Sequence, residues 1–183
     1  MSDPLPGYVR VIRIIDRITW WTGHAFALLV VPLVAANTVE VFMRYVLDRP
    51  TDWALETTVM SYGSLFMLGA ALALQKGAHV RTDIFWDKFS DRTKGIIDSV
   101  AYALLFLPSM AILFYLSLDE LVYAWSIGER STFTAWQPPL WPFRAVVPLT
   151  AVLLFLQGVS ELMKSIWAAG SGKLLVQHEK VEI

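Results

Sequence analysis

The chain has 183 residues, of which 56% are hydrophobic and only 17% carry a charged side chain. Soluble domains average about 25% charged residues, so this composition, with a mean hydropathy of +0.51, predicts an integral membrane protein. The formal net charge of −1 argues against nucleic acid as a partner. The absence of cysteine excludes disulfides, iron–sulfur clusters and cysteine-ligated zinc. We expect a single membrane domain over residues 1–183, with no cofactor and no enzymatic activity.

The N-terminal residues 8–18, YVRVIRIIDRI, combine apolar and charged side chains with a helical period. Arg10, Arg13, Asp16 and Arg17 fall on one side of the helix, and Val11 and the isoleucines fall on the other. The pattern predicts an amphipathic helix in the membrane interface, with its arginines directed toward lipid headgroups. The alternative is a cytoplasmic extension of the first membrane span.

Four apolar stretches reach the length of about 20 residues that a transmembrane helix needs. They cover approximately residues 18–46, 53–74, 96–118 and 141–167, and residues 168–183 form a tail. None shows the alternation of a barrel strand, so the predicted fold class is all-α with four transmembrane helices. Lys and Arg concentrate in the two termini and in the connection between the second and third spans. The positive-inside rule therefore places both termini in the cytoplasm.

The connection between the third and fourth spans is rich in proline and aromatic residues. Trp136 and Trp141 lie there, and Trp20 and Trp21 lie near the start of the first span. Tryptophan favours the lipid headgroup zone, so we expect these four residues in the interface. A docking surface for another subunit is the alternative for the connection.

Charged residues inside the spans gather near the predicted outer ends. Glu40 and Arg44 are four residues apart, which suits an ion pair on one helix. Glu56 lies one turn into the second span and Arg144 opens the fourth. A transporter that binds its own substrate tends to place polar groups near the midplane. We therefore expect these four residues to join helices or subunits.

Small residues form a stripe on the second span. Glu56, Gly63, Ala70 and Gly77 recur at intervals of seven, so they drift by only about 20° per step around a helix. Helix backbones approach closely along such a stripe. The pattern does not distinguish packing inside the bundle from packing against a partner chain.

The stretch LGAALALQKGAHVRTDIFWDKFSDR resembles the signature of the small membrane subunit (Q-type, DctQ-like) of tripartite ATP-independent periplasmic (TRAP) transporters. Two flanking runs, EVFMRYVLDRPTDWALE and WQPPLWPFRAVVPLTAVLLFLQGVSEL, are similar to other parts of the same family. In the central stretch the second helix of the family runs into a loop of the form G-x-H-V-R-x-D. The matching residues here are Gly77, His79, Val80, Arg81 and Asp83.

The resemblance implies a small permease subunit in the cytoplasmic membrane of a bacterium or archaeon. Its expected partners are a large permease subunit with the substrate and ion sites, a periplasmic binding protein that delivers an organic acid, and phospholipids. An ion gradient would drive uptake, and the small subunit would act as a scaffold. We expect the loop of Gly77, His79, Arg81 and Asp83 to fix topology and to hold helix ends in register.

Two other functions are considered. His24 and His79 lie on or just after adjacent spans, which allows a b-type haem anchor of an oxidoreductase. Glu40 allows a small autonomous exchanger with a proton-coupled carboxylate. Both rank below the scaffold subunit, because His79 lies beyond the predicted helix end and Arg44 gives Glu40 a fixed counter-ion.

Overall fold

The computed structural model describes residues 6–77, 89–172 and 175, and every named element in these residues is a helix. Four helical stretches in them are long and apolar enough to cross a membrane. These stretches are Gly7–Tyr45, Ala54–Gln75, Asp91–Ser126 and Trp141–Ser171. The predicted all-α class with four membrane-spanning helices is therefore confirmed.

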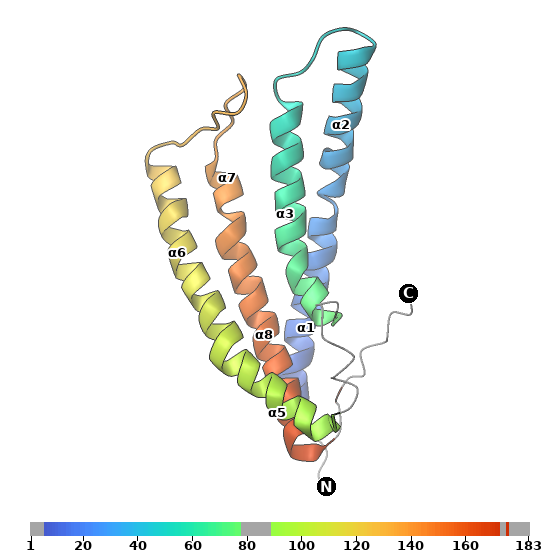
Figure 1. The fold of residues 1–183 in the computed structure, drawn as a ribbon, viewed down its shortest axis with the longest axis vertical. Coiled ribbons are helices and arrows are strands. Elements are labelled where there is room, and N and C mark those ends of the chain that lie inside the picture. Colours follow the sequence, from blue (N-terminus) through green and yellow to red (C-terminus); the bar gives the residue numbers. More distant parts are fainter. Residues whose placement is uncertain (1–5, 78–88, 173–174, 176–183) are drawn as a thin grey trace. The chain divides into compact units, whose positions relative to one another are not determined.

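Figure 1 shows the elements that make up these stretches. In chain order they are α1 (Pro6–Ala27), α2 (Val30–Tyr45), α3 (Ala54–Gln75), α5 (Asp91–Ala101), the π-helix η1 (Tyr102–Phe106), α6 (Leu107–Ser126), α7 (Trp141–Arg144) and α8 (Val146–Ser171). The second and fourth stretches agree with the predicted spans to within a few residues. The first helix begins earlier than residue 18, and the third extends beyond both predicted ends.

The predicted amphipathic helix at residues 8–18 is not a separate element. Helix α1 continues without a break from Pro6 to Ala27, so this segment and the start of the first span form one helix. The side that was predicted to be polar is also divided. Its arginines are exposed, but Asp16 hydrogen-bonds to side chains of α8. The helical period identifies the helix, whereas the partners of Asp16 lie more than 140 residues away in the sequence.

Two prolines account for breaks in the first and fourth stretches. Proline has no N–H to donate to the carbonyl four residues before it. Pro32 therefore leaves the Leu28 carbonyl without its α-helical donor, and that carbonyl accepts from the Val31 N–H at 2.9 Å in a tighter turn. Pro148 stands in the same relation to Arg144, the last residue of α7.

A third proline, Pro108, follows the π-helix η1. In this wider turn the Leu107 N–H donates to the Tyr102 carbonyl, five residues earlier. The same segment carries Phe106 onto the backbone of Gly158 in α8, where a Cβ atom would lie 2.6 Å from the ring. The π-helix thus ends just before Pro108 and places the Phe106 ring against Gly158.

The contacts divide the chain into two compact units. The terminal unit consists of the described parts of Met1–Trp21, Ala71–Ile112 and Val152–Ile183. The loop unit consists of Thr22–Ala70 and Leu113–Ala151. Small apolar residues are prominent in the interior of both units: Ala71 and Ala168 in the first, and Ala36, Ala54, Ala124 and Ala151 in the second. This is the composition expected where helices in lipid associate by close packing.

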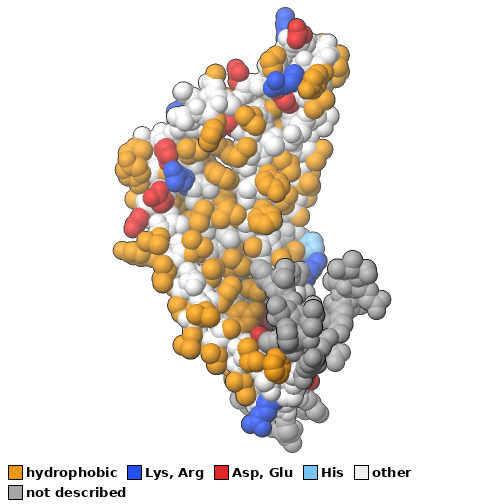
Figure 2. All heavy atoms as spheres, in the orientation of Figure 1, with side chains coloured by type: hydrophobic (Ala, Val, Ile, Leu, Met, Phe, Trp, Pro, Cys, Tyr) orange, Lys and Arg blue, Asp and Glu red, His pale blue; other side chains and the backbone are white. Residues whose placement is uncertain are grey.

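The surface carries many large hydrophobic side chains. On the face drawn in Figure 2 they cover much of the area, and charged side chains gather in a few patches. Tyr45, Phe66, Leu105 and Tyr115 are each at least 67% exposed. Soluble monomers rarely expose contiguous apolar area of this kind, so these helices face lipid or another membrane subunit.

In the terminal unit, α5 approaches α8 at Gly95. A Cβ atom at this position would lie 2.5 Å from the backbone nitrogen of Ala169 and 2.8 Å from the carbonyl oxygen of Ser165. Backbone atoms of a helix cannot move aside as the end of a flexible side chain does. Only glycine therefore fits where the two helices touch.

We predict that Gly95→Ala destabilises the chain, because the added methyl group overpacks this contact. The expected cost is about 1–3 kcal/mol, measured as a lower thermal unfolding midpoint in detergent. The control is Gly170→Ala in α8, where the added Cβ meets nothing within 4 Å and alanine is the better helix former. Equal midpoints for the two variants would contradict the contact.

Candidate functional site

Helix α8 carries a stripe of polar side chains in an otherwise apolar sequence. Gln157, Ser160, Glu161 and Lys164 are spaced so that they share one helix face. All four are buried: Gln157 and Ser160 are 0% exposed, Glu161 is 5% and Lys164 is 8% exposed. A polar group buried without partners is costly, so the stripe requires complementary groups from other helices.

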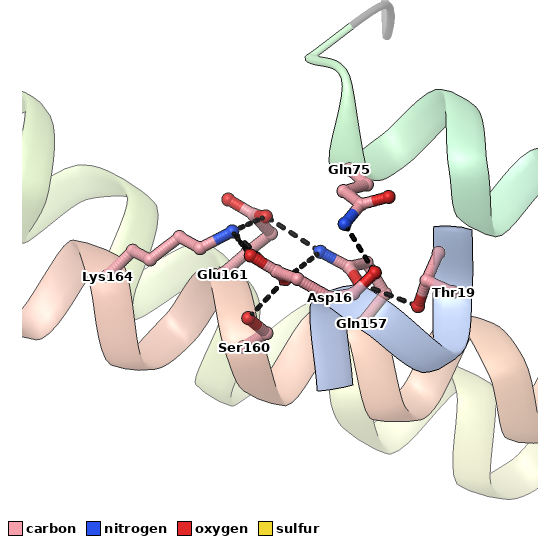
Figure 3. A network of polar contacts seen from close by, with 7 residues as sticks. All are labelled: Asp16, Thr19, Gln75, Gln157, Ser160, Glu161 and Lys164. Carbon is pink, nitrogen blue, oxygen red and sulfur yellow. Dashed lines mark hydrogen bonds and ion pairs between the residues drawn. The ribbon is translucent and has the colours of Figure 1, made fainter. Parts of the chain in front are cut away.

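Asp16 of α1 supplies the central partner (Figure 3). Its Oδ1 atom accepts hydrogen bonds from the Ser160 hydroxyl at 2.8 Å and from the Gln157 amide at 3.1 Å. Its Oδ2 atom lies 2.9 Å from the Lys164 ammonium nitrogen. One carboxylate thus connects three side chains of α8.

Three further contacts extend this group. The Lys164 ammonium also lies 2.8 Å from Glu161 Oε1, so it sits between two carboxylates. The Gln157 amide donates to Glu161 Oε1 at 2.9 Å. The Thr19 hydroxyl, one turn along α1 from Asp16, donates to Gln157 Oε1 at 2.8 Å.

Helix α3 joins the group through Gln75, its last residue. The Gln75 amide donates to the backbone carbonyl of Asp16 at 2.7 Å. We call the seven residues in Figure 3 the Asp16 cluster: Asp16, Thr19, Gln75, Gln157, Ser160, Glu161 and Lys164. Within the described residues, none of its buried polar side-chain atoms lacks a hydrogen-bond partner. The cluster therefore ties three helices together with satisfied polar contacts.

A second contact between α1 and α8 lies beside the cluster. The Tyr8 hydroxyl donates to the Met163 carbonyl, and the Tyr8 ring lies 6.4 Å from the ring of Trp167. The N-terminal turns of α1 are thus attached to α8 at two levels.

The sequence carries a pattern that indicates this cluster, but its residues are not among the predicted site residues. Four polar residues at positions i, i+3, i+4 and i+7 of an apolar span indicate a buried polar face. Gln157 and Glu161 lie in the run that resembles the family, and Lys164 lies two residues after its end. A helical wheel places Asp16 on the side of the arginines, because it does not reveal distant partners.

In the loop unit, Glu56 binds the connection that follows α6. Its side chain is in the first turn of α3, and the residue is 3% exposed. Its Oε1 atom accepts from the Thr134 N–H at 3.1 Å and from the Thr134 hydroxyl at 2.7 Å. The connection also closes on itself, because the Ser131 N–H donates to the Pro138 carbonyl at 2.9 Å. Glu56 therefore fixes a loop to a helix end.

Arg144 makes the other bridge to this connection. One guanidinium nitrogen lies 3.0 Å from Glu120 in α6, and another lies 2.8 Å from Glu129 at the start of the connection. Arginine suits such a bridge, because its planar fork presents donors in two directions. Arg144 thus links α7, α6 and the connection.

Glu40 and Arg44 form the pair that their spacing suggested, with Arg44 Nε 2.8 Å from Glu40 Oε1. The other oxygen of Glu40 accepts from the N–H of Thr51 at 2.9 Å and from its hydroxyl. Glu40 therefore attaches the loop after α2 as well as its own helix.

The small residues of α3 have different surroundings. Gly63 lies against Phe143 of α7, and a Cβ atom there would be 3.0 Å from the ring. Ala70 is half-buried. Gly77 has φ +67°, and its N–H donates to the Leu74 carbonyl at 3.0 Å. This left-handed glycine provides a C-terminal cap for α3.

Other predicted residues lie apart from these contacts. Trp20, Trp21, Trp136 and Trp141 are all exposed, from 39% to 65%. His24 on α1 is also exposed. Three residues of the loop motif, His79, Arg81 and Asp83, lie outside the described residues.

Together these features define a multi-pass α-helical membrane protein whose polar side chains join helices and loops. Residues 33–167 match the family model described as tripartite ATP-independent periplasmic transporters, DctQ component. The match covers well over half of the chain, and the chain belongs to this family. The resemblance read from the sequence is thereby confirmed. No curated protein and no solved structure is significantly similar to the chain.

We predict that Lys164→Met strongly destabilises the chain, because Asp16 and Glu161 would face each other without the ammonium between them. Removing one partner of a buried ion pair costs about 3–5 kcal/mol. Adding Asp16→Asn to Lys164→Met should recover part of that loss, which a double-mutant cycle of unfolding midpoints measures. Lys76→Met, at an exposed position, is the matched control. If the Lys164 variant were as stable as the Lys76 variant, the stabilising role of Lys164 between Asp16 and Glu161 would be refuted.

A separate prediction concerns Glu56. Glu56→Ala leaves the Thr134 N–H and hydroxyl without their acceptor, at an expected cost of about 1–3 kcal/mol. Limited proteolysis should then cleave residues 127–140 faster than in the original chain. Thr134→Val removes only the hydroxyl bond and should have a smaller effect. Asp119→Ala, at an exposed position of α6, should leave the cleavage rate unchanged.

Proposed function

We propose that the chain is the small permease subunit of a TRAP transporter, and that it binds and stabilises the large permease subunit. In this role it serves as a scaffold for uptake of an organic acid that a periplasmic binding protein delivers and an ion gradient drives. Membership of the DctQ component family, through residues 33–167, is the observation that carries the proposal.

The use of polar side chains supports a scaffold. The Asp16 cluster joins α1, α3 and α8. Glu56 and Arg144 hold the connection between α6 and α7. A subunit that supports a moving partner benefits from such internal ties, because they keep its helices in fixed positions.

The exposed apolar side chains support a membrane partner. On α2, Val41 and Phe42 are 57% and 53% exposed, and on α6, Tyr115 and Leu116 are 67% and 57% exposed. In a membrane, exposed apolar side chains can face either lipid or another helix, with which they make van der Waals contacts. We propose that part of this area contacts the large subunit and that the remainder contacts lipid.

The distribution of Lys and Arg supports an orientation in the cytoplasmic membrane. Both termini and the connection between α3 and α5 are rich in these residues, so the positive-inside rule places them in the cytoplasm. The connection between α6 and α7 then faces the periplasm, with Phe133 at 86% exposure and Trp136 at 48%.

The contacts of Glu40 favour this role over an autonomous exchanger. Its carboxylate accepts hydrogen bonds from Arg44 and from both the N–H and the hydroxyl of Thr51. A carboxylate held by these donors is suited to a structural tie rather than to repeated proton exchange.

We predict that the tagged full-length chain, purified in mild detergent from its native membrane, brings with it a permease subunit of about a dozen spans. Liposomes with the chain alone should not accumulate the organic acid that the binding protein carries, and adding the large subunit and the binding protein should restore uptake. Uptake by the chain alone would identify an exchanger instead. A Soret band in the purified chain would identify a haem anchor.

A further inference from the structure

Helix α1 presents three arginines on one exposed face. Arg10, Arg13 and Arg17 are all exposed, and at about 100° per residue they fall within roughly 60° of the helix circumference. None of them forms an ion pair or hydrogen bond with the described part of the chain. We call these three residues the arginine face.

The acidic residue of α1, Asp16, is directed elsewhere. Asp16 follows Arg13 by three residues, yet its carboxylate contacts Ser160, Gln157 and Lys164 of α8. The Lys164 ammonium supplies its counter-charge at 2.9 Å. The three positive charges of the arginine face are therefore not neutralised by Asp16.

The contact with α3 indicates where the arginine face lies relative to a bilayer. Helix α3 has 22 residues, which at 1.5 Å per residue gives about 33 Å, close to the roughly 30 Å of a hydrocarbon core. Its last residue, Gln75, donates to the Asp16 carbonyl, so Asp16 is level with that end of α3. All three arginines lie within about 10 Å of Asp16 along α1, which places them at the depth of lipid headgroups.

An apolar strip borders the arginine face on the same exposed side of α1. Val11, Ile14 and Ile18 are 44%, 51% and 44% exposed. Trp21 continues the strip at 65% exposure. Guanidinium groups beside exposed branched side chains match a phospholipid, which has an anionic phosphate next to an acyl chain.

We propose that the arginine face is a binding site for the headgroups of anionic phospholipids. The guanidinium groups of Arg10, Arg13 and Arg17 would donate to phosphate oxygens, a geometry in which arginine forms paired hydrogen bonds. The apolar strip would contact the upper part of the acyl chains. This site is independent of the proposed role as a scaffold, since it requires no partner subunit.

The test uses the detergent-purified full chain mixed with equal amounts of phosphatidylglycerol and phosphatidylcholine. Native mass spectrometry measures the ratio of the two lipids that remain bound. We expect a preference for phosphatidylglycerol. Because each basic residue near an anionic surface contributes roughly fivefold, the combined variant R10Q/R13Q/R17Q should reduce the preference by at least about tenfold.

Two matched variants separate the arginine face from general charge. K76Q/R92Q/K94Q removes the same formal charge elsewhere in the terminal unit and should reduce the preference much less. R10K/R13K/R17K keeps the charge and should retain most of the preference. An equal reduction in the first control, or an unchanged preference in R10Q/R13Q/R17Q, would overturn the proposal.

Two further outcomes are decisive. If R10Q/R13Q/R17Q aggregates, the unmodified chain supplies the test, because high salt must then weaken its preference for phosphatidylglycerol; a preference that salt does not change overturns the proposal. If R10Q/R13Q/R17Q keeps its lipid preference but no longer purifies with the large subunit, the arginine face belongs to a protein interface instead.

Discussion

A hydrocarbon environment offers no water to a polar side chain, so each such group inside a membrane helix must find a partner within the protein. In the terminal unit the constraint acts on the buried polar side chains of α8, and Asp16 is their shared partner. Its carboxylate binds three side chains of α8, and its backbone carbonyl binds the end of α3. Without Asp16, the buried Lys164 would retain only Glu161 as an acidic partner among the described residues. The rotation of α1, and hence the direction of its arginines, follows from this attachment.

The loop unit uses carboxylates in a similar way, but to hold loops. Glu40 binds Thr51 in the loop after α2, and Glu56 binds Thr134 in the connection after α6. Arg144 binds Glu129 at the start of that connection. Polar groups placed at helix ends and loops stabilise a framework and leave the lipid-facing helix surfaces apolar. This arrangement agrees with the scaffold role proposed for a component of a transporter.

The sequence predicts those features that depend on local chemistry. Composition gives the four spans, and the missing N–H of Pro32 accounts for the break in the first. The four-residue spacing of Glu40 and Arg44 gives their ion pair. Contacts across long sequence separations are different, because nothing near Asp16 indicates Lys164, which lies 148 residues later. The sequence also predicts helix from residue 8, close to the observed start of α1, but it does not show that this segment and the first span form one helix. The continuous helix packs its N-terminal turns against α8, where Tyr8 lies.

The sequence separation within the Asp16 cluster has a consequence for biosynthesis. Asp16 is made 141 residues before Gln157 and 148 residues before Lys164. At roughly 5–20 residues per second, the ribosome needs on the order of ten seconds to translate the intervening chain. During that time the partners of Asp16 in α8 do not yet exist, so its carboxylate must stay hydrated or bind another group at the membrane surface. The partners of Asp16 become available only when α8 has been made, so α1 attaches to α8 after the three preceding apolar stretches have been synthesised.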